Sequence, residues 1–492
     1  MRDSLQTFCL LTPSDVPRLR TLTNGRKTFR PSDEKEEKRE SPPCPERREK
    51  RSSGPGGKSL LAGSLLLSAG NLAAKILGAA YRVPLTNLLG TEGIGVYQMV
   101  FPVYCILLTF SSSGVPSAIA RLVASGEDGK AVLGKSLSLF AALGGIGTAA
   151  MFLFARPLAL LQGDGNATLS YLSLAPSVGL VSVISCFRGY FQGKNDMLPT
   201  AVSQVVEQTV KLAVGLTLTF FFRRDFVLAA ALACLAVSFS EGAACLYLVR
   251  VYKKKHKEKA VLKADYPIKT ILVTVLPVAA AAVLVPLSRM ADSFSVINIL
   301  NRNFPDATSL YGIYAGGVES IVGVPVATCY GAAAASVPAV AGLLREQKTK
   351  EAGRKAGLAL ALTLALSAVC ALFLFFFSDF TVGFLYSSLS GEERSLMAAL
   401  LRVASVTVVL LAVMQTANAV LVAYGKLYAP PLFLLAGVIV KAILEIVLLF
   451  HEKIGIFAVP ISDIVCYLIA VFGDLVYIRY SKRKTLRSVP SL

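Results

Sequence analysis

Apolar stretches of about 20 residues or more recur along this chain, separated by short segments that carry most of its charge. A helix of that length crosses the hydrocarbon core of a bilayer, and it satisfies its own backbone hydrogen bonds in lipid. The sequence therefore predicts an all-α integral membrane protein, with a function carried out across or within a membrane.

Charged residues make up 16% of the chain, whereas a soluble protein carries about 25%. The formal net charge is +19, but it gathers between the apolar stretches, so we attribute it to membrane orientation and expect no nucleic-acid partner. We expect twelve spans, of which the long, Gly-rich eighth is tilted or broken. The spans are 60–82, 94–118, 133–155, 167–189, 198–222, 227–251, 268–288, 309–340, 356–377, 396–422, 430–450 and 455–478.

Lys and Arg are unevenly distributed between alternate loops, which predicts how the chain is oriented. The basic loops lie at 121–135, 188–194, 250–269, 345–355 and 479–487. Placing these loops inside gives a multi-pass protein of the cytoplasmic membrane with both termini in the cytoplasm, which agrees with an even number of spans.

Residues 1–58 are polar, basic and rich in Pro, Ser and Gly, and they contain no apolar signal-peptide core. We expect a disordered N-terminal tail there. Residues 253–267 are expected to form a basic cytoplasmic linker, and residues 481–492 a cytoplasmic tail.

Short motifs repeat in the same order in the two halves of the chain, which indicates an internal duplication. This pattern predicts two parallel six-helix bundles, 59–252 and 268–480, around a central cavity suited to alternating access. The paired motifs are 114–120 with 336–341, 190–194 with 424–426, and 236–241 with 458–463.

No residue pattern indicates an enzyme. Residues 129–136 match the P-loop pattern, but they lie in a short loop between two spans and lack the preceding strand that a phosphate cradle requires. The nine cysteines and two histidines form no cluster suited to catalysis or to a metal. We therefore expect no catalytic residue, no metal and no cofactor.

The first span carries a stripe of polar and small residues at intervals of three and four, which places them on one helical face. The stripe ends in two cations, so it can hold an anion; the alternative is a packing face in which Lys75 neutralises a neighbouring acid. Its members are Ser64, Ser68, Asn71, Lys75, Gly78 and Arg82.

Opposite charges four residues apart occur in the fifth span, as Glu207 and Lys211, and in the eleventh, as Lys441 and Glu445. Each pair can neutralise itself along its own helix, which we favour. The alternative is a polar wall of the cavity, to which Gln204 would also contribute.

Isolated carboxylates within spans are costly in lipid and suit coupling to H⁺ or Na⁺. The ion-coupling candidates are Glu241, Glu319 and Asp463. Glu319 could equally be the ionic partner of Lys75 or Arg82. Arg289 and Asp292 lie at the end of the seventh span.

Residues 187–201, FRGYFQGKNDMLPTA, with Val205-Val206-Glu207-Gln208, resemble stage V sporulation protein B and related polysaccharide biosynthesis membrane proteins. Lys75-Ile76-Leu77-Gly78, Tyr81-Arg82, residues 89–97 and Asp292-Ser293-Phe294 support the resemblance, which covers about residues 59 to 480. It places the chain in the multidrug/oligosaccharidyl-lipid/polysaccharide exporter superfamily.

The resemblance implies a flippase for a polyprenyl-pyrophosphate-linked oligosaccharide or peptidoglycan precursor, used in cell-wall, spore-cortex or polysaccharide synthesis. It implies membrane lipid and cell-wall synthesis proteins as partners of a monomer, with coupling to Na⁺, H⁺ or the membrane potential. The expected substrate-binding residues are Asn71, Lys75, Arg82, Tyr97, Gln98, Gln204, Glu207, Lys211, Arg289 and Glu319.

Two other functional classes stay open. A cation-coupled multidrug exporter of the same superfamily would be expected to have a cavity rich in acids and aromatic residues. A membrane glycosyltransferase or polymerase would need a long catalytic loop, and none is evident outside the N-terminal tail.

Overall fold

The computed structural model describes the backbone of residues 57–109, 114–126, 128–255, 268–302, 306–451 and 453–487. Within these ranges, the side chains at 57–69, 71, 72, 75, 270, 273, 274, 277, 278, 330–338 and 483–487 are not described. All regular elements in these ranges are helices, so the predicted all-α fold is confirmed.

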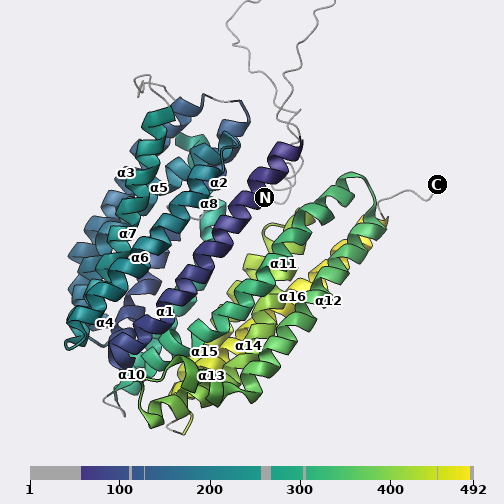
Figure 1. Ribbon diagram of the computed structural model, residues 1–492. Helices are drawn as coiled ribbons and strands as arrows, with labels where there is room; N and C mark the ends of the chain where they lie inside the picture. Colours follow the sequence, from purple (N-terminus) through teal and green to yellow (C-terminus); the bar gives the residue numbers. More distant parts are fainter. Residues whose placement is uncertain are drawn as a thin grey trace, which may run out of the picture. The chain divides into compact units, whose positions relative to one another are not determined.

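The first half of the chain forms one bundle (Figure 1), in which α5 packs against α3 and α7, while α6 packs against α1 and α7. Its helices are α1 (Gly57–Leu108), α2 (Val115–Ala124), α3 (Gly129–Leu153), α4 (Ala155–Leu161), α5 (Ala167–Gly193), α6 (Leu198–Phe222) and α7 (Phe226–Lys255).

The second half forms another bundle, in which α14 packs against α11, α12 and α16. The elements of this half of the chain are α8 (Ile268–Ala282), α9 (Leu284–Leu300), α10 (Ala307–Tyr311), the π-helix η3 (Gly312–Val318), α11 (Glu319–Arg345), α12 (Thr349–Phe376), α13 (Ser378–Leu385), α14 (Gly391–Ala423), α15 (Ala429–Leu449), the 3₁₀ turn η4 (Gly455–Phe457) and α16 (Ala458–Arg487).

Eleven helices among the described residues are long and apolar enough to cross a membrane. One of them belongs to α1, which is interrupted at Gly90, where φ is 69° and ψ is −175°. Glycine adopts this left-handed backbone without steric cost, so it can join two helices that run in different directions. Dividing α1 at Gly90 separates the predicted spans 60–82 and 94–118 and gives the predicted count of twelve.

Two local expectations need correction. Residues 129–136 are not a loop but the first turns of α3, whose N-terminus is capped by the Asp128 side chain. The helix begins there because the Asp128 carboxylate accepts a hydrogen bond from the Lys130 backbone N–H, at 3.0 Å. The short helices α4 and α13, which follow the third span of each half, were not predicted.

The eighth predicted span is broken, as expected from its glycines, because α10 and α11 are joined by the π-helix η3. The same segment is where the two bundles approach most closely. A Cβ atom on Gly316 would lie 2.5 Å from Cγ1 of Ile94 in α1, and one on Gly312 would meet the Thr91 carbonyl. Glycine at these positions therefore allows backbone contact between the bundles.

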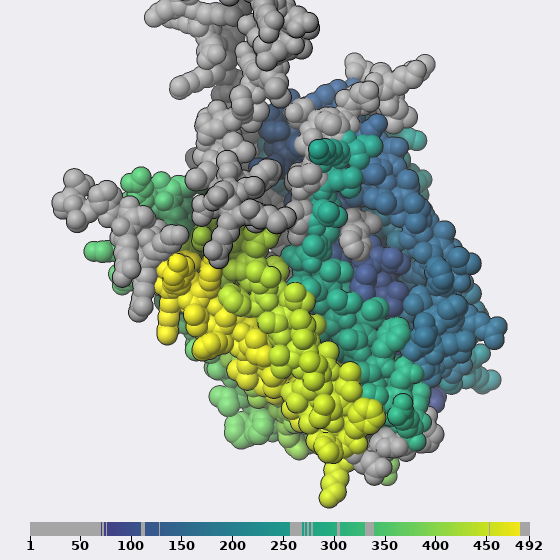
Figure 2. Space-filling model, turned by 180° about the vertical axis from the view of Figure 1, so that it is seen from behind, coloured from purple at the N-terminus to yellow at the C-terminus, as the bar shows by residue number. Residues whose placement is uncertain are grey.

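The seventh predicted span, 268–288, divides at Val283 between α8 and α9. Ile271 and Val275 of α8 share an apolar cluster with Val115 and Leu248 of the first bundle, whereas α9 packs against α15. Figure 2 shows this teal segment between the blue helices of the first bundle and the yellow-green helices of the second. Packing therefore favours a boundary between the bundles at Val283 rather than at residue 268.

Candidate functional site: a cationic cavity between the bundles

Two adjoining cavities lie between the bundles and share Arg82, Gln98 and Phe101 in their walls. The wide cavity, of about 430 Å³, is bounded by α1, α6 and α11. The narrow cavity, of about 170 Å³, is bounded by α1, α9, η3 and α11. Both bundles contribute walls, so the predicted central cavity is confirmed.

Three cations from three helices line these cavities: Arg82 on α1, Lys211 on α6 and Arg289 on α9. Arg82 is exposed and makes no ion pair with a carboxylate in the described part of the chain. The Lys211 ammonium lies 5.7 Å from the centre of the Tyr81 ring, within the range of a cation–π contact. The walls therefore favour an anion.

Glu319, the first residue of α11, is the carboxylate that pairs with a cavity cation. Its Oε2 lies 3.3 Å from Nη2 of Arg289, and the two side chains are 21% and 49% exposed, respectively. The suggestion that Glu319 pairs with Arg82 is therefore wrong. Because the pair is open to the narrow cavity, a bound anion could compete with Glu319 for Arg289.

Gln98 lies in the walls of both cavities, and its side-chain amide donates a hydrogen bond to the Ala315 carbonyl, at 3.1 Å. Tyr97 lines the wide cavity and is otherwise buried. These two residues occupy positions suited to substrate contact, as do Arg82, Lys211, Arg289 and Glu319.

Gln204, Glu207 and Glu241 do not line either cavity. Glu207 Oε2 accepts a hydrogen bond from Nη2 of Arg188 at 2.9 Å, so the expected pairing of Glu207 with Lys211 along α6 is wrong. Glu241 is buried, and its Oε2, like Oε1 of Gln204, has no hydrogen-bond partner within the described ranges.

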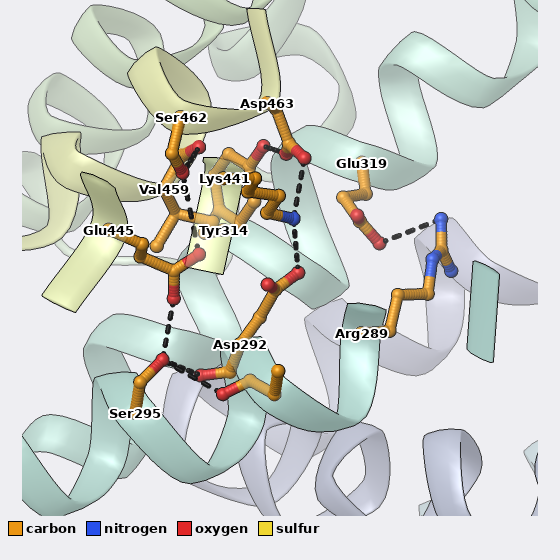
Figure 3. A network of polar contacts seen from close by, with 11 residues as sticks. Arg289, Asp292, Ser295, Tyr314, Glu319, Lys441, Glu445, Val459, Ser462 and Asp463 are labelled. Carbon is orange, nitrogen blue, oxygen red and sulfur yellow. Dashed lines mark hydrogen bonds and ion pairs between the residues drawn. The ribbon is translucent and has the colours of Figure 1, made fainter. Parts of the chain in front are cut away.

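The second bundle contains a more extensive polar network (Figure 3). The Lys441 ammonium donates to Oδ2 of Asp292 at 2.7 Å and to Oδ1 of Asp463 at 2.6 Å, and all three side chains are buried. The Tyr314 hydroxyl donates to Oδ2 of Asp463 at 2.7 Å. Lys441 therefore joins α9, α15 and α16, and its expected pairing with Glu445 is wrong.

The side chains of Asn71 and Lys75 lie outside the described residues, so their role stays a prediction. Gly78 and Arg82, the last members of the predicted stripe, do line the wide cavity. The sequence reasoning missed Tyr314 and Ser295 as members of the polar network. Their hydroxyls lie on helices remote in sequence from Asp463 and Glu445, so no local spacing could have indicated the contacts.

A family model described as "Polysaccharide biosynthesis protein" matches residues 60–344. The chain belongs to this family. The chain is 28% identical over 423 residues to stage V sporulation protein B of Bacillus subtilis, covering 82% of this chain and 80% of that protein. It is 31% identical over 182 residues to the lipid II flippase MurJ of the same organism, covering 34% of each.

Solved structures support the fold assignment. An inward-facing multidrug resistance MATE family transporter of the MOP superfamily aligns with a TM-score of 0.69 and 16% identity, covering 88% of this chain and 99% of that one. The chain therefore has the fold of this transporter, and the eleven long apolar helices of its described ranges make it a multi-pass membrane protein.

Proposed function

We propose that this protein is a flippase that moves a polyprenyl-pyrophosphate-linked oligosaccharide or peptidoglycan precursor across the cytoplasmic membrane by alternating access. The observation that carries the proposal is the excess of cations in the cavity walls, where Arg82, Lys211 and Arg289 face two carboxylates, Glu319 and Asp292. Glu319 is paired with Arg289, and Asp292 with the buried Lys441. Hydrogen bonds between such cations and phosphate are about twice as strong as neutral ones.

Arg82 and Arg289 belong to different bundles and both line the narrow cavity. A diphosphate bound there would be in reach of cations from both bundles, so its binding would depend on their relative position. This dependence is what alternating access requires, because a ligand shifts a conformational equilibrium only through different affinities for the two states.

The wide cavity adds an apolar surface beside these cations. Ile76 of α1 and Val324 of α11 line it and are 60% and 50% exposed, respectively. The small residues Gly78, Ala79, Gly323 and Ala327 line it as well. An apolar wall next to a cationic one fits an amphipathic substrate whose lipid chain stays in the hydrocarbon while its headgroup enters the cavity.

Hydrogen bonds connect the bundles at the ends that the loop charges predict to be external. Asn87 of α1 donates to the Leu385 carbonyl at 2.7 Å and accepts from the Ser388 hydroxyl at 2.6 Å. Thr91 donates to Glu393 at 2.5 Å. We propose that this outer latch, formed by Asn87, Thr91, Leu385, Ser388 and Glu393, is closed here and that the cavity faces the cytoplasm, where a precursor would be loaded.

The proposal can be tested with the purified protein in liposomes that contain a fluorescent lipid-linked precursor, by following its movement between leaflets. We expect Arg82→Ala and Arg289→Ala to abolish most of the movement. Arg156→Ala, an exposed cation of α4 outside both cavities, should leave it unchanged. Equal rates in all three variants would refute a role for the cationic cavity.

The alternative, a cation-coupled multidrug exporter, predicts the opposite selectivity. Three cations in the cavity walls disfavour a positively charged drug. The protein in the same liposomes should therefore not transport a cationic dye against its gradient. Dye transport that persists in the Arg82→Ala variant would favour the exporter.

A further inference from the structure

Asn298 on α9 makes the same contacts in the second half of the chain that Asn87 on α1 makes in the first. The side-chain amide of each residue donates to the carbonyl four residues earlier on its own helix, at 2.9 Å for Asn298 and 3.1 Å for Asn87. Each amide also donates to the other half of the chain, Asn298 to the Leu161 carbonyl at 2.8 Å and Asn87 to the Leu385 carbonyl at 2.7 Å. Leu161 and Leu385 are the last residues of the short helices α4 and α13.

Two threonines show the same relationship further along each half. Thr91 follows the break at Gly90 and donates to Oε1 of Glu393 at 2.5 Å, whereas Thr308 on α10 donates to Oδ2 of Asp164 at 2.8 Å. Each threonine lies at the start of the second span of its half, and each carboxylate follows the short helix of the other half. The hydrogen bonds between the bundles thus occur as two sets related by the internal duplication.

Four consecutive residues of the α4–α5 connection, 161–164, hydrogen-bond to α9, to the residue that follows it, or to α10. Besides the two contacts given above, the Gly163 carbonyl accepts from the side-chain amide of Asn301 at 3.1 Å. The Gln162 amide donates to Oγ of Ser293 at 3.1 Å, and both of these side chains are buried. This set therefore combines bonds at the surface with a bond in the interior.

These bonds connect the two bundles at their outer ends. α4 packs against α5 of the first bundle, whereas α9 packs against α15 of the second, to which the Asp292–Lys441 ion pair also attaches it. α4, α10 and α13 lie toward the same end of the molecule in Figure 1, the end that the loop charges predict to be external. A motion that separates the bundles at this end has to break both sets, since a hydrogen bond does not persist beyond about 3.5 Å.

We propose that residues 161–164 form a second latch with Ser293, Asn298, Asn301 and Thr308, and that it opens together with the outer latch when the cavity faces outward. This inference rests on the proposed function, because it assumes alternating access. Asn298 and Asn301 are exposed, so water can replace their bonds at small net cost when the bundles separate. The alternative is a fixed joint, in which these bonds persist in both states and the bundles turn about them. The duplication favours a latch, because equivalent contacts are separated alike when two parallel bundles move apart.

Asn298→Ala distinguishes the two cases, since a bond present in both states does not affect their ratio. Outward opening can be measured with a single cysteine at Ala315, which lines the narrow cavity, in a protein that has no other cysteine. The rate of its reaction with a membrane-impermeant thiol reagent added outside cells should rise about fivefold in Asn298→Ala, because one hydrogen bond is lost from the closed state alone. A fixed joint predicts no change, and that result would overturn the inference.

Two further variants make the comparison specific. Asn166→Ala replaces an exposed asparagine of the same α4–α5 connection that makes none of these contacts, so it should leave the rate unchanged. Combining Asn298→Ala with Asn87→Ala should multiply the two increases, since each substitution removes bonds from the same closed state. If the double variant reacts no faster than Asn87→Ala alone, the second latch does not hold the cavity closed and the inference is wrong.

A reversible cross-link tests the second latch without removing a bond from the closed state. Asp164→Cys and Thr308→Cys place two thiols where the native side-chain oxygens are 2.8 Å apart, so a short bifunctional methanethiosulfonate can join the bundles. In liposomes that contain the fluorescent lipid-linked precursor, this cross-link should stop the movement of the precursor, and a reducing agent should restore it. Movement that continues with the bundles joined would show that the contact is a fixed joint.

The control pair is Asp164→Cys with Thr168→Cys, whose cross-link stays within the first bundle because Thr168 lies on α5. Joining this pair should leave the movement unchanged. A wild-type protein that moves no precursor would refute the proposed function. The labelling of the cysteine at Ala315 uses no substrate, so it decides the second latch independently of that result.

Discussion

Arg289 and Glu319 form an ion pair across the narrow cavity, with 3.3 Å between Nη2 and Oε2, and the arginine remains half exposed. The pair connects α9 to the first residue of α11 at the point where the π-helix ends. The guanidinium has further N–H donors beyond this contact, so the ion pair holds a cavity-lining cation in place and leaves it able to bind an anion.

Substitution of Arg289 and substitution of Glu319 should change the affinity for an anion in opposite directions. Arg289→Ala should weaken the binding of farnesyl diphosphate roughly 10- to 150-fold, since a hydrogen bond to a charged group contributes about 1.5–3 kcal/mol. Glu319→Gln should strengthen it a few-fold, because a partly exposed ion pair contributes about 0.2–1 kcal/mol. Weaker binding by Glu319→Gln in calorimetry would mean that Glu319 orients Arg289 rather than competing with the anion.

Lys441 should be essential for the stability of the second bundle. Lys441→Ala leaves two buried aspartates without a cation, and breaking such a pair costs about 3–5 kcal/mol. The melting temperature of the detergent-solubilised Lys441→Ala protein should be far below that of the wild type. Lys426→Ala, which replaces an exposed lysine before α15, is the control and should leave the melting temperature unchanged. Combining Asp292→Asn, Lys441→Met and Asp463→Asn should recover stability, and no recovery would contradict the charge-based explanation.

Weakening the outer latch should open the cavity to the outside. Asn87→Ala removes the contacts to Leu385 and Ser388, each worth about 1 kcal/mol, so the ratio of outward-open to closed protein should rise by up to about 30-fold. The change can be measured with a single cysteine at Ala315, which lines the narrow cavity, in a protein that has no other cysteine. The outward-open state should let this cysteine react with a membrane-impermeant thiol reagent added outside. Asn166→Ala, outside the latch, should have no effect; equal labelling in both variants would show that the latch does not hold the closed state.

The orientation predicted from loop charge can be tested with single cysteines in whole cells. Cysteines at the exposed residues Asp306 and Glu392 should react with the external reagent, while those at Lys255 and Lys350 should be protected. External labelling at Lys255 would reverse the orientation and place the outer latch on the cytoplasmic side.

The sequence was sufficient to predict the helical fold, because hydropathy and helix length are local properties. It also drew attention to Arg82, Lys211, Arg289 and Glu319, which line the cavities, since charges inside apolar spans are conspicuous. It was wrong about partners. Spacing along a helix suggested Glu207 with Lys211 and Lys441 with Glu445, whereas the actual ion pairs connect different helices.

The break at Gly90 and the division at Val283 could not be located from sequence for a related reason. Hydropathy does not change at either position. A local backbone angle and a change of packing partner do not depend on amino-acid composition, so neither can be predicted from it. The Gly-rich character of the eighth span, in contrast, did indicate that its helix would be irregular.

The division of the seventh span at Val283 has a mechanical consequence. Since α8 is packed into the first bundle and α9 into the second, this single membrane crossing is shared by both, and any rocking motion must bend it between Ala282 and Leu284. The basic linker predicted at 253–267 then does not have to accommodate this motion. We therefore expect cutting the linker to be tolerated, whereas a cross-link that fixes α8 to α9 would stop the transport cycle.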